Sequence, residues 1–172
     1  MHAELLILRL VHVLGGLFWV GSGLFTTFYL MPALASAGPA AGQVMAGLQK
    51  RRLFTVLPLV ALLTILSGLR LMWITSAGFS SAYLDSANGR TLIAGGVAAI
   101  AAFVLSLLVA RPAAVRSAAL GASLAGMPEG EARAAAANEL AALRRRTTIA
   151  SHTAVALLLL AASSMAVARY LG

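Results

Sequence analysis

Cysteine is absent from the sequence, which excludes disulfides, iron–sulfur clusters and thiolate metal sites. Charge is scarce as well, because only 10% of the residues are Asp, Glu, Lys or Arg, against roughly 25% in a typical soluble protein. We find no paired-carboxylate site, Ser/His/Asp set, phosphate-binding loop, nucleic-acid module or metal-spaced histidine cluster. The sequence therefore argues against hydrolases, phosphoryl-transfer enzymes and partners made of nucleic acid.

Apolar sequence is abundant instead, and four long runs contain no charged residue. Hydrophobic residues make up 60% of the chain. The four runs are Leu10–Gln49, Leu53–Leu69, Thr91–Ala110 and Thr147–Ala168. A bilayer core is crossed by about 20 apolar residues, so each run is long enough or nearly long enough for one crossing. We predict an all-α integral membrane protein, a single four-helix domain of residues 1–172 with spans at about 5–31, 53–76, 90–111 and 147–170.

Prolines, glycines and polar residues predict where these helices end. We expect Pro32 to end the first helix, and residues 36–47 to form a loop with at most one helical turn at the interface. Residues 77–89 are expected to form a short outer loop. The third helix is expected to continue past Pro112 and to form, with the start of the fourth, a cytoplasmic helical hairpin of residues 112–146. No repeat of the solenoid type is visible.

The net charge of +8 is concentrated at the ends of the predicted spans. The connections after the first and third spans carry nine basic residues, and the opposite side carries four. The nine are Lys50, Arg51, Arg52, Arg111, Arg116, Arg133, Arg144, Arg145 and Arg146, and the four are Arg9, Arg70, Arg90 and Arg169. Because basic residues favour the cytoplasmic side, we predict that the first and third connections lie in the cytoplasm and that both termini face the periplasm or the exterior.

The first helix could be mistaken for a cleaved signal peptide, because Ala33-Leu34-Ala35 imitates a cleavage site. No basic residue precedes Glu4, however, and an apolar segment of about 22 residues exceeds the usual 7–15 of a signal peptide. We therefore expect the first helix to be retained.

One face of the first helix carries a histidine in apolar surroundings. His12, Gly16, Trp19 and Gly23 follow one another at intervals of 4, 3 and 4 residues, and Arg9 lies one turn before His12. An ionisable side chain inside a membrane helix is by default a candidate functional residue. Two interpretations stay open: a close helix crossing with His12 hydrogen-bonded across it, or a haem held by His12 with a propionate on Arg9.

Further candidate metal ligands are His152, Met72 and Met165. At 1.5 Å per residue, His12 lies about 10 Å from the outer boundary and His152 about 8 Å from the inner one. Across a core of about 30 Å the two histidines differ in height by roughly 12 Å, so we do not expect one haem to bind both. Met165 has a suitable height but points about 140° away from His152 on the helix. Only one of them can therefore face the interior.

Arg70, near the outer end of the second span, has two possible roles. Its long side chain can extend to the interface, or it can join Arg9 and Arg90 in a basic collar that binds propionates or another anion.

Three segments of the chain resemble a known group of membrane proteins. These are LRLVHVLGGLFWVGSGLFTTFYLMPAL in the first helix, LPLVALLTILSGLRLMW in the second and MAVARYL at the end. They resemble small four-helix bacterial proteins of the copper-resistance D (CopD) and HemJ-type protoporphyrinogen oxidase group. The resemblance implies that His12 matches the family's haem- or metal-binding histidine. Where HemJ-type proteins carry a second histidine, this chain has Tyr29 and Met31, and its only lysine is Lys50 in a loop, which argues against protoporphyrinogen oxidation.

Three functions follow as hypotheses. The first is a b-type haem protein for electron transfer with a redox partner protein, in which His12 is an axial ligand. The other ligand would be Met72, Met165, water, or His12 of a second subunit in a homodimer. The second is a copper-binding or copper-transport protein that uses His12 and the outer methionines. The third is a cofactor-free accessory or scaffold subunit of a larger membrane complex. The basic hairpin would bind either a cytosolic protein or anionic lipid.

Overall fold

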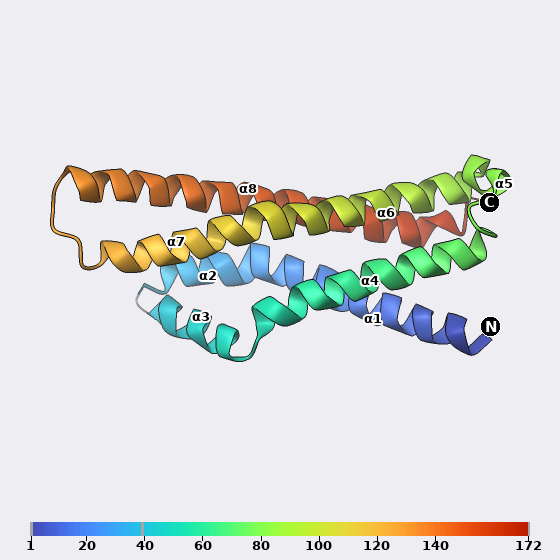
Figure 1. Cartoon of the computed structure of the whole chain (residues 1–172), viewed down its shortest axis with the longest axis horizontal. Coiled ribbons are helices and arrows are strands. Elements are labelled where there is room, and N and C mark those ends of the chain that lie inside the picture. Colours follow the sequence, from blue (N-terminus) through green and yellow to red (C-terminus); the bar gives the residue numbers. More distant parts are fainter. Residues whose placement is uncertain (1, 39, 172) are drawn as a thin grey trace.

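Long helices form almost the whole of the computed structural model, which describes residues 2–38 and 40–171 (Figure 1). No strand occurs among these residues. Four stretches are long and apolar enough to cross a membrane: His2–Ser36, Leu53–Thr75, Ala87–Leu124 and Glu131–Ala168. The predicted all-α architecture is confirmed, and the four helices are compatible with a membrane helical bundle.

The outer surface of the bundle exposes large apolar side chains over the charge-free parts of its long helices. Leu17, Val97 and Leu108, on the first and third long helices, are 61–67% exposed. Water-soluble monomers rarely expose apolar patches of this extent. Such a surface is suited to contact with lipid chains.

The first long helix continues through Pro32, so the prediction that this proline ends the helix was wrong. It consists of α1 (His2–Phe25), the π-helical turn η1 (Thr26–Leu30) and α2 (Met31–Ser36). In η1 the Met31 N–H donates to the carbonyl of Thr26, five residues back. A proline ring has no N–H and clashes with the carbonyl four residues before it in a regular α-helix. The wider π-turn accommodates the ring without a break.

The third long helix also accommodates a proline, Pro112, by means of a π-helical turn. It consists of α6 (Ala87–Leu105), the π-helical turn η2 (Ser106–Ala110) and α7 (Arg111–Leu124). The Arg111 N–H donates to the Ser106 carbonyl, directly before Pro112. The predicted continuation of this helix past Pro112 is confirmed.

Both connections that were expected to be loops contain helix. Residues 40–50 form the three-turn helix α3 (Ala40–Lys50), where at most one turn was predicted. Alanine, glutamine, methionine and leucine in this segment favour a helix, and they outweigh its two glycines. The chain then turns at Arg52, which has a left-handed backbone conformation with φ of 58°.

At the other end, residues 77–89 include the short helix α5 (Ser81–Asp85) and the start of α6. The Ser86 hydroxyl accepts a hydrogen bond from the Gly89 N–H at 3.0 Å, so α6 begins at Ala87 rather than near residue 90. The hydroxyl of Tyr83 is buried without a hydrogen-bond partner in the described residues, and this desolvation raises the pKa of Tyr83 above its ordinary value.

The remaining helices are α4 (Leu53–Thr75) and α8 (Glu131–Ala168). The 38-residue α8 is uninterrupted, and its first half packs against the antiparallel α7 to form a hairpin whose tip extends beyond α2 and α3 (Figure 1). Arg116 of α7 forms an ion pair with Glu139 of α8. Both chain termini lie at the opposite end of the bundle (Figure 1), which we call the termini end.

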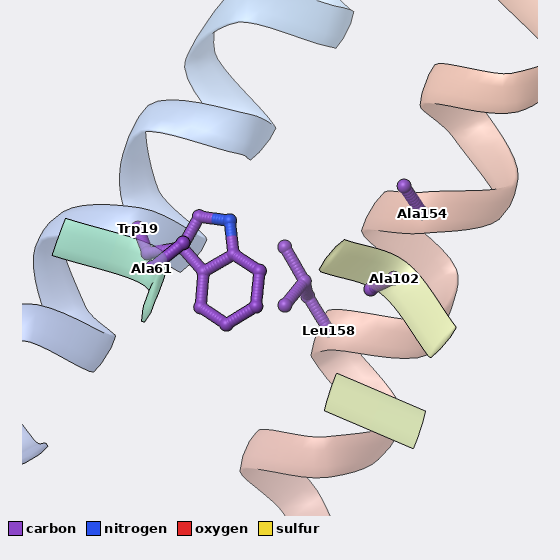
Figure 2. Packing of buried hydrophobic residues seen from close by; sticks show 5 residues of the cluster. All are labelled: Trp19, Ala61, Ala102, Ala154 and Leu158. Carbon is purple, nitrogen blue, oxygen red and sulfur yellow. The ribbon is translucent and has the colours of Figure 1, made fainter. Parts of the chain in front are cut away.

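The long helices pack most closely as two pairs, α1 with α4 and α6 with α8. Between the pairs lies a small core cluster of Trp19, Ala61, Ala102, Ala154 and Leu158 (Figure 2). Trp19 is the one large aromatic side chain in this cluster, and its ring meets Phe103 edge-on with centroids 6.3 Å apart. The alanines leave room for this ring between the pairs.

The two pairs share features spaced 80 residues apart. Gly15-Gly16 of α1 corresponds to Gly95-Gly96 of α6, and η1 with Pro32 corresponds to η2 with Pro112. A Cβ on Gly95 would lie 2.8 Å from the Ser164 Cβ and 3.3 Å from the Ala161 carbonyl oxygen of α8. A Cβ on Gly15 would overlap with the Thr64 hydroxyl of α4. Each pair therefore depends on a glycine at its crossing.

This close crossing predicts unequal effects for two adjacent alanine substitutions. Gly95→Ala should destabilise the protein by about 1–3 kcal/mol, because the new methyl group overlaps α8. Gly96→Ala is the matched control, since its Cβ would meet only the flexible Met72 methyl at 3.8 Å. Reversible unfolding in mixed detergent micelles measures both values. Equal stability of the two variants would contradict the crossing described here.

Candidate functional site

A cavity of about 900 Å³ lies between the two helix pairs, on the termini side of the core cluster. Side chains of α1, α4, α6 and α8 line it, and most of them are apolar. Its volume is in the upper part of the usual range for ligand pockets, roughly 300–1,000 Å³. Six of the predicted site residues line this cavity: Arg9, His12, Gly16, Trp19, Met72 and Met165.

His12 is the polar centre of the cavity, and its hydrogen bond defines its tautomer. The Nδ1 atom lies 2.8 Å from the Thr64 carbonyl oxygen of α4. A carbonyl oxygen only accepts, so Nδ1 carries the proton and donates. In a neutral imidazole the lone pair is then on Nε2. Nε2 has no hydrogen-bond partner among the described residues, and it is not one of the buried polar atoms.

Small residues bring the His12 ring to the backbone of α4. A Cβ on Gly68 would lie 2.6 Å from Cε1 and 2.9 Å from Nδ1 of the ring. Any side chain at position 68 would therefore displace the imidazole. Gly15, one turn further along α1, allows the equally close approach of Thr64.

The hydroxyl groups near this contact are already satisfied within α4. The Thr64 hydroxyl donates to the Val60 carbonyl at 2.8 Å, and the Ser67 hydroxyl donates to the Leu63 carbonyl at 2.7 Å. The Ser67 hydroxyl also lies 3.0 Å from the Thr64 carbonyl oxygen, which therefore accepts from Ser67 as well as from His12. This bonding to the preceding turn is common for Ser and Thr in helices. It leaves the Thr64 carbonyl as the group that orients the histidine.

Trp19 and Leu158 belong both to the cavity lining and to the core cluster. Trp19 is only 8% exposed, and its ring points towards Leu158 (Figure 2). These two side chains therefore lie where the cavity meets the packed core. Gly23, the last residue of the predicted stripe, is not part of the cavity lining, and its Cβ position is 3.6 Å from Val155 and Leu158 of α8.

Two thioethers face the cavity from opposite helix pairs. Met72 of α4 lies one turn beyond Gly68, and its methyl group reaches to 3.8 Å from the Cβ position of Gly96 on α6. Met165 lies on α8, where it is partly buried. The cavity thus combines one imidazole with two soft sulfur atoms.

The two outer arginines differ in their partners. Arg9 lines the cavity, is exposed and has no ion-pair partner in residues 2–38 and 40–171. Arg70 is outside the lining and binds Glu4, with its Nη2 and Nε at 2.8 and 3.0 Å from one carboxylate oxygen. Of these two arginines, only Arg9 lines the cavity. Arg70 is paired with Glu4 and does not take part in the basic collar suggested by the sequence.

His152 is also outside the cavity. Its side chain is exposed on α8, its Nδ1 lies 2.8 Å from the Thr148 carbonyl oxygen of the same helix, and its ring meets Phe28 edge-on at 5.3 Å. Met165 lines the cavity while His152 does not, in keeping with the angle between them on the helix.

Sequence reasoning missed the residues of α4 that receive His12. Neither Thr64 nor Gly68 was among the predicted site residues. The available signal was the small residues Ser67 and Gly68, which lie three and four residues after Thr64 and so share one helix face with it. That signal identifies a close crossing, but only the three-dimensional fold shows that His12 lies opposite it.

Comparison with known proteins identifies no relative of this chain. No protein-family model matches the chain, and neither a curated protein nor a solved structure shows significant similarity to it. Within the described residues, no three His, Asp or Glu side chains are grouped so that they could hold a metal ion. Any metal chemistry at the cavity would therefore depend on His12 together with the methionines or a prosthetic group.

The contact between His12 and Gly68 predicts the state of the histidine. Nitrogen NMR of the protein in detergent should show the His12 tautomer protonated at Nδ1. Gly68→Ala should displace the ring and remove this signature, because the new methyl group would overlap Cε1. Gly16→Ala is the matched control, since its Cβ would be 3.8 Å from the Thr64 methyl group. An unchanged His12 signal in Gly68→Ala would exclude the hydrogen bond described here.

Proposed function

We propose that this chain is a membrane protein that binds b-type haem through Nε2 of His12 and transfers electrons to or from a redox partner protein. The observation that carries the proposal is the His12 tautomer. Histidines that bind metals usually donate their other ring N–H to a carbonyl or carboxylate, which orients the ring. The Thr64 carbonyl has this role for His12.

The residues around His12 fit a flat, largely apolar prosthetic group. Gly16 of α1 and Gly96 of α6 present no side chain to the cavity, and the remaining lining is mainly aliphatic. Arg9 offers a free guanidinium at the termini end for a propionate. Met72 or Met165 would supply a thioether as a further ligand, which in cytochromes raises the reduction potential. Haem bound there would supply one-electron redox chemistry, while the chain orients it and excludes water from it.

A copper-handling function is the second candidate, and one specific observation favours it. His12, Met72 and Met165 line the same cavity although they come from three different helices. Imidazole and thioether ligands suit Cu(I). The same three residues would hold the ion, and Arg9 would then have no role in binding it.

We also propose an orientation for the bundle. The termini end faces the periplasm or exterior, and α3, α7 and the first half of α8 lie in the cytoplasm as the predicted hairpin and loop. The distribution of nine basic residues on one side and four on the other supports this orientation. The haem site would then lie in the outer half of a bacterial inner membrane.

An absorption spectrum tests the haem proposal directly. The purified chain, supplemented with haem in detergent, should give a reduced-minus-oxidised spectrum of haem b. His12→Ala should lower the bound haem at least about tenfold. Removing a residue that only hydrogen-bonds to a metal ligand already lowers metal affinity by about 10–100-fold, and His12 would be the ligand itself. His152→Ala should retain wild-type haem content, because His152 is outside the cavity.

A colourless wild-type protein after supplementation would overturn the haem proposal. Cu(I) titration of the same sample then tests the alternative. Met72→Leu and Met165→Leu should each weaken Cu(I) binding, and their helical content, measured by circular dichroism, should match the wild type. A protein that binds neither group would indicate the scaffold function.

The absence of cysteine makes the orientation simple to test, because an introduced cysteine is the sole thiol. Ala82→Cys in α5 and Ala122→Cys in α7 both place it at an exposed position. A membrane-impermeant maleimide added to intact spheroplasts should label the first variant and should reach the second only after lysis. The reverse pattern would invert the proposed orientation.

A further inference from the structure

A second, smaller cavity lies on the other side of the core cluster from the His12 site. It has a volume of about 470 Å³ and is open to the surroundings between the α6–η2 segment and α8. Its lining includes Arg145, Arg146 and Ile149 of α8 and Leu105 and Val109 of the α6–η2 segment. It shares no residue with the His12 cavity.

The lining of this groove changes from charged to apolar where the membrane boundary is expected. Arg145 and Arg146 directly precede the charge-free run that starts at Thr147. Leu105 and Val109 lie near the end of another charge-free run, which stops at Arg111. The groove therefore has two guanidinium groups at the edge of the span and an aliphatic wall within it.

The two arginines of the groove have no acidic partner among the described residues. Elsewhere on the same side of the bundle, Arg116 pairs with Glu139 and Arg133 with Glu129. Arg145 and Arg146 form no such pair in residues 2–38 and 40–171, and both are exposed. Their charge is thus available to an external anion.

The apolar wall of the groove is equally without a partner. Ile149, one turn beyond Arg145, is 55% exposed. Ala142 and Ala150 have short side chains, so they leave the groove open along α8. Val109, in the π-turn η2, lines the opposite side of the groove. A chain of methylene groups would cover these aliphatic surfaces.

From this arrangement we infer that the groove binds an anionic phospholipid, with its phosphate at Arg145 and Arg146 and an acyl chain along Leu105, Val109 and Ile149. The inference rests on the membrane assignment of the helices and is independent of any cofactor at His12. Basic pockets between membrane helices are a known way to hold acidic head groups. A soluble anion would use only the charged half of the groove, so the aliphatic half favours a lipid.

Native mass spectrometry of the full chain in a neutral detergent tests this inference. Phosphatidylglycerol should be retained at a higher level than phosphatidylcholine, and the combined Arg145→Gln and Arg146→Gln variant should lose this preference. The expected weakening is about fivefold for each arginine and about 25-fold for both, which corresponds to the usual contribution of a basic residue near an anionic membrane surface.

Arg144→Gln removes one charge from the same basic triplet and is the matched control for Arg145→Gln or Arg146→Gln alone, because Arg144 is not part of the groove lining. This variant should retain phosphatidylglycerol within about twofold of wild type, as expected for an exposed charge outside the binding site. An equal loss in the Arg144 control would show general attraction to a basic surface and would overturn the site. Equal retention of the two lipids by the wild type would overturn it as well.

Glycerol phosphate separates a lipid from a free phosphate compound. The inference requires that this soluble head group does not displace phosphatidylglycerol at equal concentration, since it cannot cover Val109 and Ile149. Displacement by glycerol phosphate would mean that the arginines bind a soluble anion, and the lipid inference would then be wrong. Circular dichroism of each variant should show the wild-type helical content, so that a loss of bound lipid is not caused by unfolding.

Discussion

The contact between the His12 ring and the backbone of α4 is the constraint on which the cavity depends. The imidazole reaches the Thr64 carbonyl because Gly68 has no side chain, and Gly15 lets Thr64 approach α1 equally closely. In lipid, helices gain no hydrophobic stabilisation from association, so close backbone packing and hydrogen bonds must hold them together. One contact therefore both fixes the α1–α4 crossing and orients the ring nitrogen that faces away from α4.

The bundle combines two similar helix pairs, and their similarity explains where the cavity lies. Positions 12, 16, 19 and 20 of α1 line it, and so do positions 92, 96, 99 and 100 of α6, each 80 residues later. Each pair is tightly packed at its own glycine, whereas the contacts between the pairs concentrate around Trp19. Space therefore remains between the pairs on the termini side of that tryptophan.

The sequence predicted the four helices well, because long charge-free runs have few alternatives to a membrane helix. It failed at Pro32, since helix breaking by proline is a local rule and a π-turn circumvents it. For the site, periodicity placed His12, Gly16 and Trp19 on one face. The pairing of His12 with Gly68, and of Arg70 with Glu4, joins residues far apart in the chain, and no local pattern specifies such a partner.

The two pairs also bear on whether His12 serves packing or binding. At the equivalent place in the second pair stands Leu92, which lines the same cavity and fills space without polar atoms. A histidine at this place leaves Nε2 accessible and without a hydrogen-bond partner among the described residues. A leucine fills the same kind of space without offering a lone pair, so packing alone does not require an imidazole here. The unused lone pair of Nε2 is the group that a ligand in the cavity would bind, which favours binding over packing as the role of His12.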